Sequence, residues 1–194
     1  MQDFVWLIPL MPLISAIFLM VFSSKLPPTT VGFFGTGSVG MSALLTCNLT
    51  WGYLKDPDLF TVSLWTWMKV GELSANVGFH IDGLTIVMMM IITCVGFLIH
   101  LFSCEFMEHD KSYARYFAYL NMFVSAMLIL VMSDNLLLLY LGWEGVGVCS
   151  YLLVGFWYQH SSNGRAARKA FIVTRIGDTA MMLGLLILFT ELGT

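Results

Sequence analysis

Long apolar runs alternate with short polar clusters along the whole chain. A helix that crosses a bilayer needs roughly 20 mainly apolar residues. The pattern therefore predicts an all-α integral membrane protein with about six transmembrane helices. The stretches that qualify are residues 4–22, 31–54, 83–104, 114–132, 135–158 and 168–190.

The breaks between the runs carry residues that stop and start helices. Lys25-Leu26-Pro27-Pro28 follows the first run, and proline cannot continue a helix. Asp82 and Asn135 stand just before apolar runs, where a side-chain oxygen can accept from free backbone N–H groups. The first run has no positive residues before it and no small-residue cleavage site after it. We therefore expect it to remain as a spanning helix and not to be removed as a secretory signal.

Residues 59–81 follow a different pattern. Between Thr61 and Trp67 polar residues alternate with β-forming apolar ones, and Gly71 follows. This predicts a small β-hairpin, whose tryptophans suit the headgroup layer of a membrane. The chain is thus divided into two N-terminal transmembrane helices (1–58), an extracytoplasmic hairpin (59–81) and the remaining helices (82–194).

Composition supports the membrane class. Of 194 residues, 58% are hydrophobic and only 11% charged, and the mean hydropathy is +0.83; a soluble domain carries about twice that charge. A net charge of −3 without a basic face gives no sign of a nucleic-acid partner. The cysteines have no metal-ligand spacing and are expected to be buried, inert thiols: Cys47, Cys94, Cys104 and Cys149.

The positive charges predict an orientation. With the helices taken in order, one side of the membrane holds six Lys and Arg residues and the other holds Lys55 and Lys69. The more positive side is expected to be cytoplasmic, which places the N-terminus outside. The six residues are Lys25, Lys111, Arg115, Arg165, Arg168 and Lys169.

Glu144 is the first candidate for chemistry, because it lies near the middle of the fifth run. A charge there costs roughly 2.5–3.5 kcal/mol on insertion scales. A nearby cation lowers the pKa of a carboxyl group and desolvation raises it, so a moving cation changes its proton affinity. Gly142, Gly145 and Gly147 would let another helix approach closely. We interpret Glu144 as a proton-relay residue; the alternative is a structural carboxylate hydrogen-bonded between helices.

Asp178 and Arg175 lie inside the sixth run, three positions apart and therefore on nearly the same helix face. We expect Asp178 to join the proton relay and Arg175, which cannot usefully deprotonate, to tune it electrostatically. The alternative is an ion pair between the two that only makes insertion possible.

For the other ionisable residues a structural role is the favoured interpretation. Arg168 and Lys169 are expected to anchor the sixth helix where it enters the bilayer. His80 and Asp82 flank the third helix as a surface histidine and a cap. His100 could face a polar path, but an interfacial position near a helix end is the favoured expectation.

Nothing in the sequence indicates a soluble enzyme. It contains no glycine-rich phosphate loop, no cysteine cluster for iron–sulfur and no nucleophile with an oriented base. Any redox cofactor is therefore expected in another subunit.

Three segments resemble one known family: residues 79–84 (FHIDGL), 136–147 (LLLLYLGWEGVG) and 169–178 (KAFIVTRIGD). From about residue 60 onward the chain resembles the antiporter-like membrane subunit of proton-pumping NADH:quinone oxidoreductase, respiratory complex I. This subunit is called L in bacteria and 5 in mitochondria. The resemblance implies a proton channel built from two inverted helix repeats, of which residues 82–194 would begin the first.

The resemblance also implies roles for residues. Glu144 matches a fifth-helix glutamate that pairs with a lysine on the family's seventh helix, and Arg175 and Asp178 match sixth-helix positions near it. The family chain is roughly three times longer, so we expect this sequence to be its first third, with that lysine outside it.

The expected function follows from this resemblance. The subunit would couple electron transfer from NADH to quinone to proton pumping through buried charged residues, without redox chemistry of its own. NADH, FMN, iron–sulfur clusters and quinone would be held by partner subunits. Expected partners are other membrane-arm subunits, above all another antiporter-like subunit, in a bacterial inner (plasma) membrane in preference to a mitochondrial one.

Two alternatives remain open. The same motifs occur in multisubunit sodium/proton antiporters and in related energy-coupling membrane complexes. A helix bundle that only scaffolds a complex would also fit the hydropathy. Substitution of Glu144 by Gln distinguishes proton transport from a scaffold.

Overall fold

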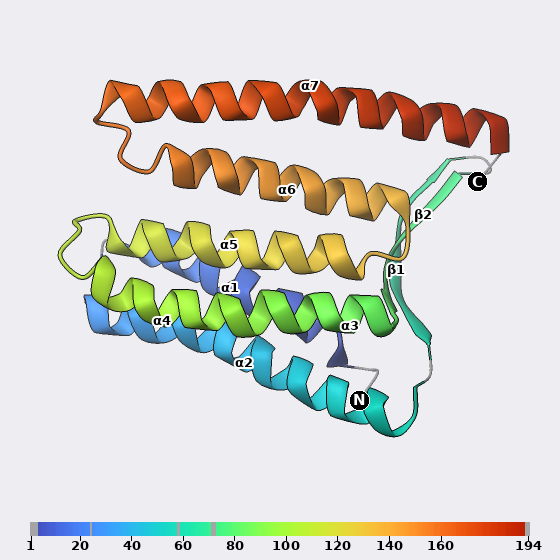
Figure 1. Cartoon of the computed structure of the whole chain (residues 1–194), viewed down its shortest axis with the longest axis horizontal. Coiled ribbons are helices and arrows are strands. Elements are labelled where there is room, and N and C mark those ends of the chain that lie inside the picture. The colour runs from blue at the N-terminus through green and yellow to red at the C-terminus, as the bar shows by residue number, and fades with distance from the viewer. Residues whose placement is uncertain (1–3, 24, 58, 71–72, 193–194) are drawn as a thin grey trace.

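The computed structural model describes residues 4–23, 25–57, 59–70 and 73–192. Helices dominate it, and a β-hairpin lies at one end of them (Figure 1). In chain order the elements are α1 (Leu7–Phe22), α2 (Pro28–Lys55), β1 (Phe60–Val70), β2 (Leu73–Ile81), α3 (Gly83–Met90), the π-helical segment η2 (Ile91–Val95), α4 (Gly96–Phe106), α5 (Tyr113–Met132), α6 (Leu136–Val154) and α7 (Ser161–Leu192).

The expected transmembrane helices are present. Five described helices are long and apolar enough to cross a membrane: α2, the continuous helix Gly83–Phe106, α5, α6 and α7. The first, α1, is apolar but shorter, with 16 residues. The sequence did not predict that the third helix would contain a π-helical segment between α3 and α4.

Two predicted caps are confirmed. Asp82 Oδ1 accepts from the backbone N–H of Thr85 at 2.7 Å and begins α3. Asn135 Oδ1 accepts from the N–H of Leu138 at 2.9 Å and begins α6. The Thr85 hydrogen bond also holds the pKa of Asp82 below its ordinary value.

The predicted hairpin is confirmed and is fastened to the helices. β1 and β2 pair antiparallel, with irregular register between Ser63 and Trp65 and between Thr66 and Met68. Gly78 O accepts from the N–H of Asp134 at 3.2 Å, and a Cβ at Gly78 would lie 2.1 Å from Asp134 Oδ2. No side chain larger than hydrogen fits there. The predicted turn residue Gly71 lies outside the described residues.

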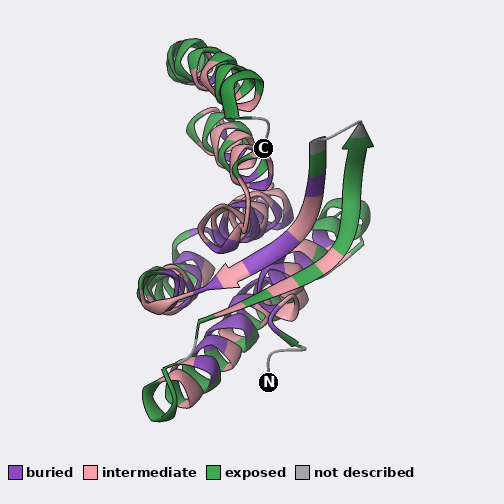
Figure 2. Ribbon diagram, turned by 90° about the vertical axis from the view of Figure 1, so that its right-hand side faces the viewer, coloured by how far each residue is buried: buried purple, intermediate pink, exposed green. Residues whose placement is uncertain are grey.

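The helices form a packed bundle with a row extending from it. Helices α1, α2, α4 and α5 pack together, whereas α6 packs along α5 and α7 along α6. The view along the helices shows α5, α6 and α7 in a row that leads away from the bundle, with mostly exposed residues on α7 (Figure 2).

Two buried clusters hold the bundle. At the hairpin end, Phe79 and Ile81 of β2 pack with Leu128 and Met132 of α5. At the other end, Phe117 is fully buried in a second cluster with residues of α1, α2 and the loop before α5. The bundle α1–α5 therefore supplies a firm support on one side of α6.

The positive residues sort to the two ends as predicted. Lys25 lies between α1 and α2, Lys111 between α4 and α5, and Arg165 in the first turns of α7. All three connections are at the end opposite the hairpin (Figure 1). Helix α7 begins seven residues before the predicted boundary, so Arg168 and Lys169 lie inside the helix.

Candidate functional site

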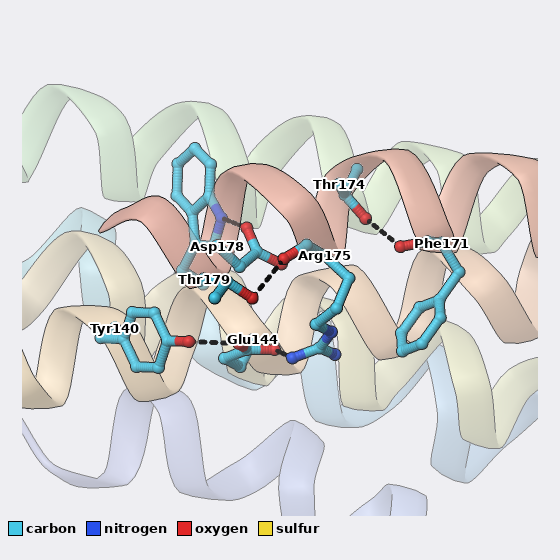
Figure 3. A network of polar contacts seen from close by, with 8 residues as sticks. Tyr140, Glu144, Phe171, Thr174, Arg175, Asp178 and Thr179 are labelled. Atoms are coloured by element: carbon cyan, nitrogen blue, oxygen red, sulfur yellow. Dashed lines mark hydrogen bonds and ion pairs between the residues drawn. The ribbon is translucent and has the colours of Figure 1, made fainter. Parts of the chain in front are cut away.

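A charge pair joins α6 to α7. Arg175 Nη1 donates to Glu144 Oε2 in an ion pair, the one found within the described residues. Tyr140 lies one turn before Glu144 on α6, and its hydroxyl donates to Glu144 Oε1 at 2.7 Å (Figure 3). Both carboxylate oxygens of Glu144 are thus engaged, one by a cation and one by a neutral donor.

Arg175 is held in place from a second side. Its guanidinium carbon lies 4.6 Å from the centre of the Phe171 ring, one turn earlier on α7, a cation–π contact. The side chain of Arg175 is 37% exposed and that of Glu144 is 18% exposed. The pair is therefore accessible from the open side of the α6–α7 row.

Asp178 is bound elsewhere. Its Oδ1 accepts from the indole N–H of Trp143 at 2.7 Å, and the residue is 5% exposed. The ion pair between Arg175 and Asp178 that was considered from their spacing is not what forms. Arg175 reaches across to the facing helix, and Trp143 supplies the hydrogen bond that Asp178 needs.

Of the two acids, Asp178 lines a groove beside α6 and α7 and Glu144 does not. Trp143 and Asp178 line a groove of about 650 Å³ between α5, α6 and α7, whose other walls are mostly apolar and include Leu130 and Phe171. Glu144 is not among the groove's lining residues. Successive residues of a helix point about 100° apart, which separates the contacts of residues 143 and 144.

Tyr140 and Trp143 were not singled out from the sequence. The sequence did contain an indication for Tyr140, because it lies four residues before Glu144 and therefore on the same helix face. Both have a polar hydrogen on an apolar ring, and such groups usually find a partner when buried. An intramembrane acid is the natural acceptor.

His100 is fully buried in the bundle, six residues before the end of α4. One minor expectation was wrong. The cysteines are not all buried: Cys149 is, but Cys47 is exposed and Cys94 and Cys104 are intermediate. Among the described residues, no group of three or more His, Cys, Asp or Glu side chains could hold a metal ion.

The remaining candidates lie apart from the contacts of Glu144 and Asp178. His80 Nδ1 lies 2.9 Å from the Thr61 hydroxyl across the hairpin. Arg168 and Lys169 are exposed on α7, near the positively charged end. None of these three residues contacts Glu144, whose partners are Tyr140 and Arg175.

Chemically, the site pairs an acid with a fixed cation inside a spanning segment. The proton affinity of such an acid depends on the distance to the cation and on access to water. The guanidinium cannot give up its proton usefully, so the carboxyl group is the member that can bind and release H⁺.

Two family models match this chain. Residues 67–117 match the model described as NADH-Ubiquinone oxidoreductase (complex I), chain 5 N-terminus. Residues 133–194 match the model described as NADH:quinone oxidoreductase/Mrp antiporter, TM. The second match contains Tyr140, Glu144, Arg175 and Asp178.

Sequence relatives agree with these matches. NADH-quinone oxidoreductase subunit L of Pseudomonas aeruginosa is 46% identical over 188 residues, which cover 95% of this chain and 31% of the relative. Subunit L of Escherichia coli is 45% identical over the same length and share of this chain, and 30% of the relative is covered. The chain thus spans about a third of the length of these curated relatives.

A solved structure shares the fold. It is described as the membrane-bound sulfane sulfur reductase (MBS), an archaeal respiratory membrane complex, and it superposes with a TM-score of 0.78 at 18% identity. The match covers 97% of this chain and 28% of the other. At this identity the likeness concerns the fold alone.

Proposed function

The chain belongs to the family of antiporter-like membrane subunits shared by NADH:quinone oxidoreductases and Mrp antiporters, and from this we propose that it forms part of a proton-translocating subunit of the membrane arm of complex I. The observation that carries the proposal is the Glu144–Arg175 pair between two spanning helices, with Tyr140 on the second carboxylate oxygen. A structural helix bundle has no need of an acid in this position, because an apolar residue would insert more easily.

Glu144 is the group that binds and releases the proton. In general a nearby cation favours an ionised carboxylate and its removal favours the protonated form, so the contact with Arg175 gives the proposed relay a part that can change. A separation can arise when another cation from the remainder of the subunit competes for Glu144. Moving one charge against 100 mV takes about 2.3 kcal/mol, which corresponds to a pKa change of less than two units.

Asp178 serves as a second acid on the groove side of the same helix pair. Its Oδ1 accepts a hydrogen bond from the indole N–H of Trp143, which orients the carboxyl group without a cation. Arg175 contacts Glu144 directly and lies three residues before Asp178 on α7. Its contribution is electrostatic. The relay thus comprises Glu144 and Asp178, with Arg175 as the group that tunes them.

Electron transfer belongs to other subunits in this proposal. The relatives are subunits of NADH-quinone oxidoreductase by name, so NADH, FMN, iron–sulfur clusters and quinone are assigned to partner chains. Energy released there would reach this subunit through neighbouring membrane-arm subunits, with another antiporter-like subunit in direct contact.

The described helices support a multi-pass membrane protein, and the relatives named above are bacterial. We assign the chain to a bacterial inner membrane. The hairpin and the N-terminus face outward, and the end with Lys25, Lys111 and Arg165 faces the cytoplasm.

Glu144→Gln in the full-length subunit tests the proposal. The amide keeps the size of the side chain and can still accept a hydrogen bond, but it does not titrate. Membrane vesicles carrying the assembled complex should oxidise NADH while moving fewer protons for each pair of electrons. Glu105→Gln is the matched control, because Glu105 is exposed near the end of α4 and should leave the ratio unchanged. An unchanged ratio in Glu144→Gln would support a scaffold.

A sodium/proton antiporter subunit is the second candidate, because the model that matches residues 133–194 includes Mrp antiporters. The same vesicles separate the two functions. Proton movement that requires NADH oxidation and not sodium indicates complex I, whereas proton movement driven by a sodium gradient without NADH indicates an antiporter.

A further inference from the structure

His100 is a buried ionisable group that the proton relay does not use. It lies on α4, in the bundle formed by α1–α5, and it is fully buried. Its Nδ1 lies 2.7 Å from the backbone oxygen of Gly96. A carbonyl oxygen only accepts, so Nδ1 carries the hydrogen and Nε2 of the neutral ring is an acceptor.

Nε2 of His100 has no hydrogen-bond partner among the described residues. Buried polar atoms in proteins nearly always have one, supplied by the protein or by ordered water. The side chain of Arg115, the other residue with such an atom, is only partly buried and lies close to the positively charged end. His100 Nε2 is therefore the buried acceptor in the bundle for which a hydrogen-bond donor is still to be identified.

The backbone next to His100 is also unusual. The π-helical segment Ile91–Val95 ends at Gly96, whose N–H contacts the oxygens of both Ile92 and Thr93. π-Helical segments are rare and occur frequently at functional sites. The residue that ends this segment is the one whose oxygen fixes the His100 ring.

Polar side chains lie further along α4 and on the α5 turns that flank Phe117. Ser103 lies three residues after His100, so the two share a helix face, and its hydroxyl lies 3.3 Å from that of Tyr116 on α5. The ring of Phe117 lies 6.0 Å from that of His100. One turn further along α5, the fully buried Asn121 accepts from the hydroxyl of Ser38 at 2.9 Å.

A metal ion does not fit, because no group of three metal-ligating side chains occurs among the described residues. The acceptor at Nε2 needs an O–H or N–H donor that is small enough to enter a packed helix contact. We propose that His100 Nε2 binds a water molecule enclosed between α4 and α5, with the Ser103–Tyr116 hydroxyl pair as its second contact.

This water would create a hydrated site separate from Glu144. It completes a hydrogen-bonded series from His100 through the water to Ser103 and Tyr116. Tyr116 packs edge-on against Phe156, at 5.5 Å between ring centres, on the side of the positively charged end. The inference rests on the bundle α1–α5 and not on the proposed proton transport.

A density map of the intact membrane complex at a resolution that shows ordered water tests the proposal directly. The expected result is a peak within about 3 Å of His100 Nε2 and within hydrogen-bonding distance of the Ser103 or Tyr116 hydroxyl. An empty position, or a protein donor bound directly to Nε2, would overturn it.

A second test compares variants by X-ray hydroxyl-radical labelling. In this method X-rays generate hydroxyl radicals from water, and a trapped water therefore leads to labelling of the side chains beside it. Labelling of the segment containing Tyr116 and Phe117 should be lost in His100→Phe and reduced in Ser103→Ala. Ser42→Ala is the matched control, because both serines are buried and each donates to a backbone oxygen, Ser103 to that of Ile99 at 2.7 Å and Ser42 to that of Ile8 at 2.8 Å. Equal labelling in all three variants would refute the site. The map of the unaltered complex decides the matter when a variant fails to assemble.

Discussion

The indole N–H of Trp143 lies 2.7 Å from Asp178 Oδ1 and joins α6 to α7 on the side of the groove. The next residue along α6, Glu144, joins the same two helices through Arg175. Two adjacent residues thus make two polar connections, each to a different charged residue of α7. The helix pair is fixed in rotation as well as in distance, since both connections must form together.

Trp143→Phe removes one of these connections while keeping an aromatic ring. A hydrogen bond in a protein contributes about 0.5–3 kcal/mol, the larger figures applying to charged partners, so the free energy of unfolding of the subunit should fall by an amount in that range. Proton translocation should fall as well, because Asp178 loses the donor that orients it. Thermal unfolding of the detergent-solubilised protein and vesicle pumping measure the two effects.

Trp157→Phe is the control for that experiment. Trp157 also donates to a carboxylate, Asp110 Oδ2 at 2.8 Å, but it is exposed and lies in the loop after α6. Its replacement should change both measurements little. Equal losses in the two variants would show that the Trp143 bond has no special role.

Arg175→Gln removes the cation from Glu144. Removing one member of a fully buried pair costs about 3–5 kcal/mol, whereas an exposed pair contributes about 1 kcal/mol or less. Since Arg175 is 37% exposed, the expected loss of stability lies nearer the smaller figure. Pumping should fall much more than stability does.

Arg175→Lys separates charge from shape in the same experiment. A lysine keeps the positive charge but not the planar guanidinium, which also contacts the Phe171 ring. Pumping in this variant should lie between that of the wild type and that of Arg175→Gln. A Lys variant no better than the Gln variant would mean that charge alone is not what Glu144 needs.

Gly142→Ala should separate α5 from α6. A Cβ at Gly142 would lie 2.6 Å from the backbone nitrogen of Leu130, which cannot move aside as a side chain can. Overpacking of this kind typically costs about 1–3 kcal/mol. Gly147→Ala in the same helix meets no heavy atom within 4 Å and should be neutral or slightly stabilising. Thermal unfolding of the two variants compares them, and similar melting temperatures would refute the predicted contact.

Asp82→Ala should weaken the start of α3 by about 1 kcal/mol, the usual effect of losing an N-terminal cap. The Thr85 N–H lowers the pKa of Asp82 from its ordinary 3.8. The stabilisation is therefore present above that unfolded value and is lost as the pH falls through the lower folded value. Melting temperatures between pH 7 and pH 3 should show it.

Asp82→Asn keeps a side-chain acceptor without a titrating group. It should retain much of the stability at pH 7 and lose the part of the pH dependence that Asp82 causes. If the Asn and Ala variants melted alike, the cap would not be the source of the effect.

The fold could be predicted largely because a bilayer leaves few choices. Backbone groups in lipid must be satisfied within the segment, so each long apolar run had to be a helix. The hairpin followed from the alternation between Thr61 and Trp67. The π-helical segment at Ile91–Val95 could not be predicted, because apolar residues with the same pattern form ordinary helix on both sides of it.

The site was predicted in its members but not in its pairing. Glu144, Arg175 and Asp178 stood out because charges are rare in apolar runs. Their spacing placed Arg175 beside Asp178, yet the partner of an arginine on a helix also depends on how the neighbouring helix is rotated. That rotation is set by packing over α5 and α6, for which no single segment of sequence carries the information.

The junction between the hairpin and α6 limits how this subunit can work. Asn135, which begins α6, also donates through Nδ2 to Asn76 O of the hairpin at 2.7 Å, and the hairpin in turn is buried against α5 through Phe79. A displacement of α6 along its own axis would break the hydrogen bond between Asn135 and Asn76. In the proposed mechanism, a movement that changes the surroundings of Glu144 would therefore come from its own side chain or from the less constrained α7, while α6 stays in place.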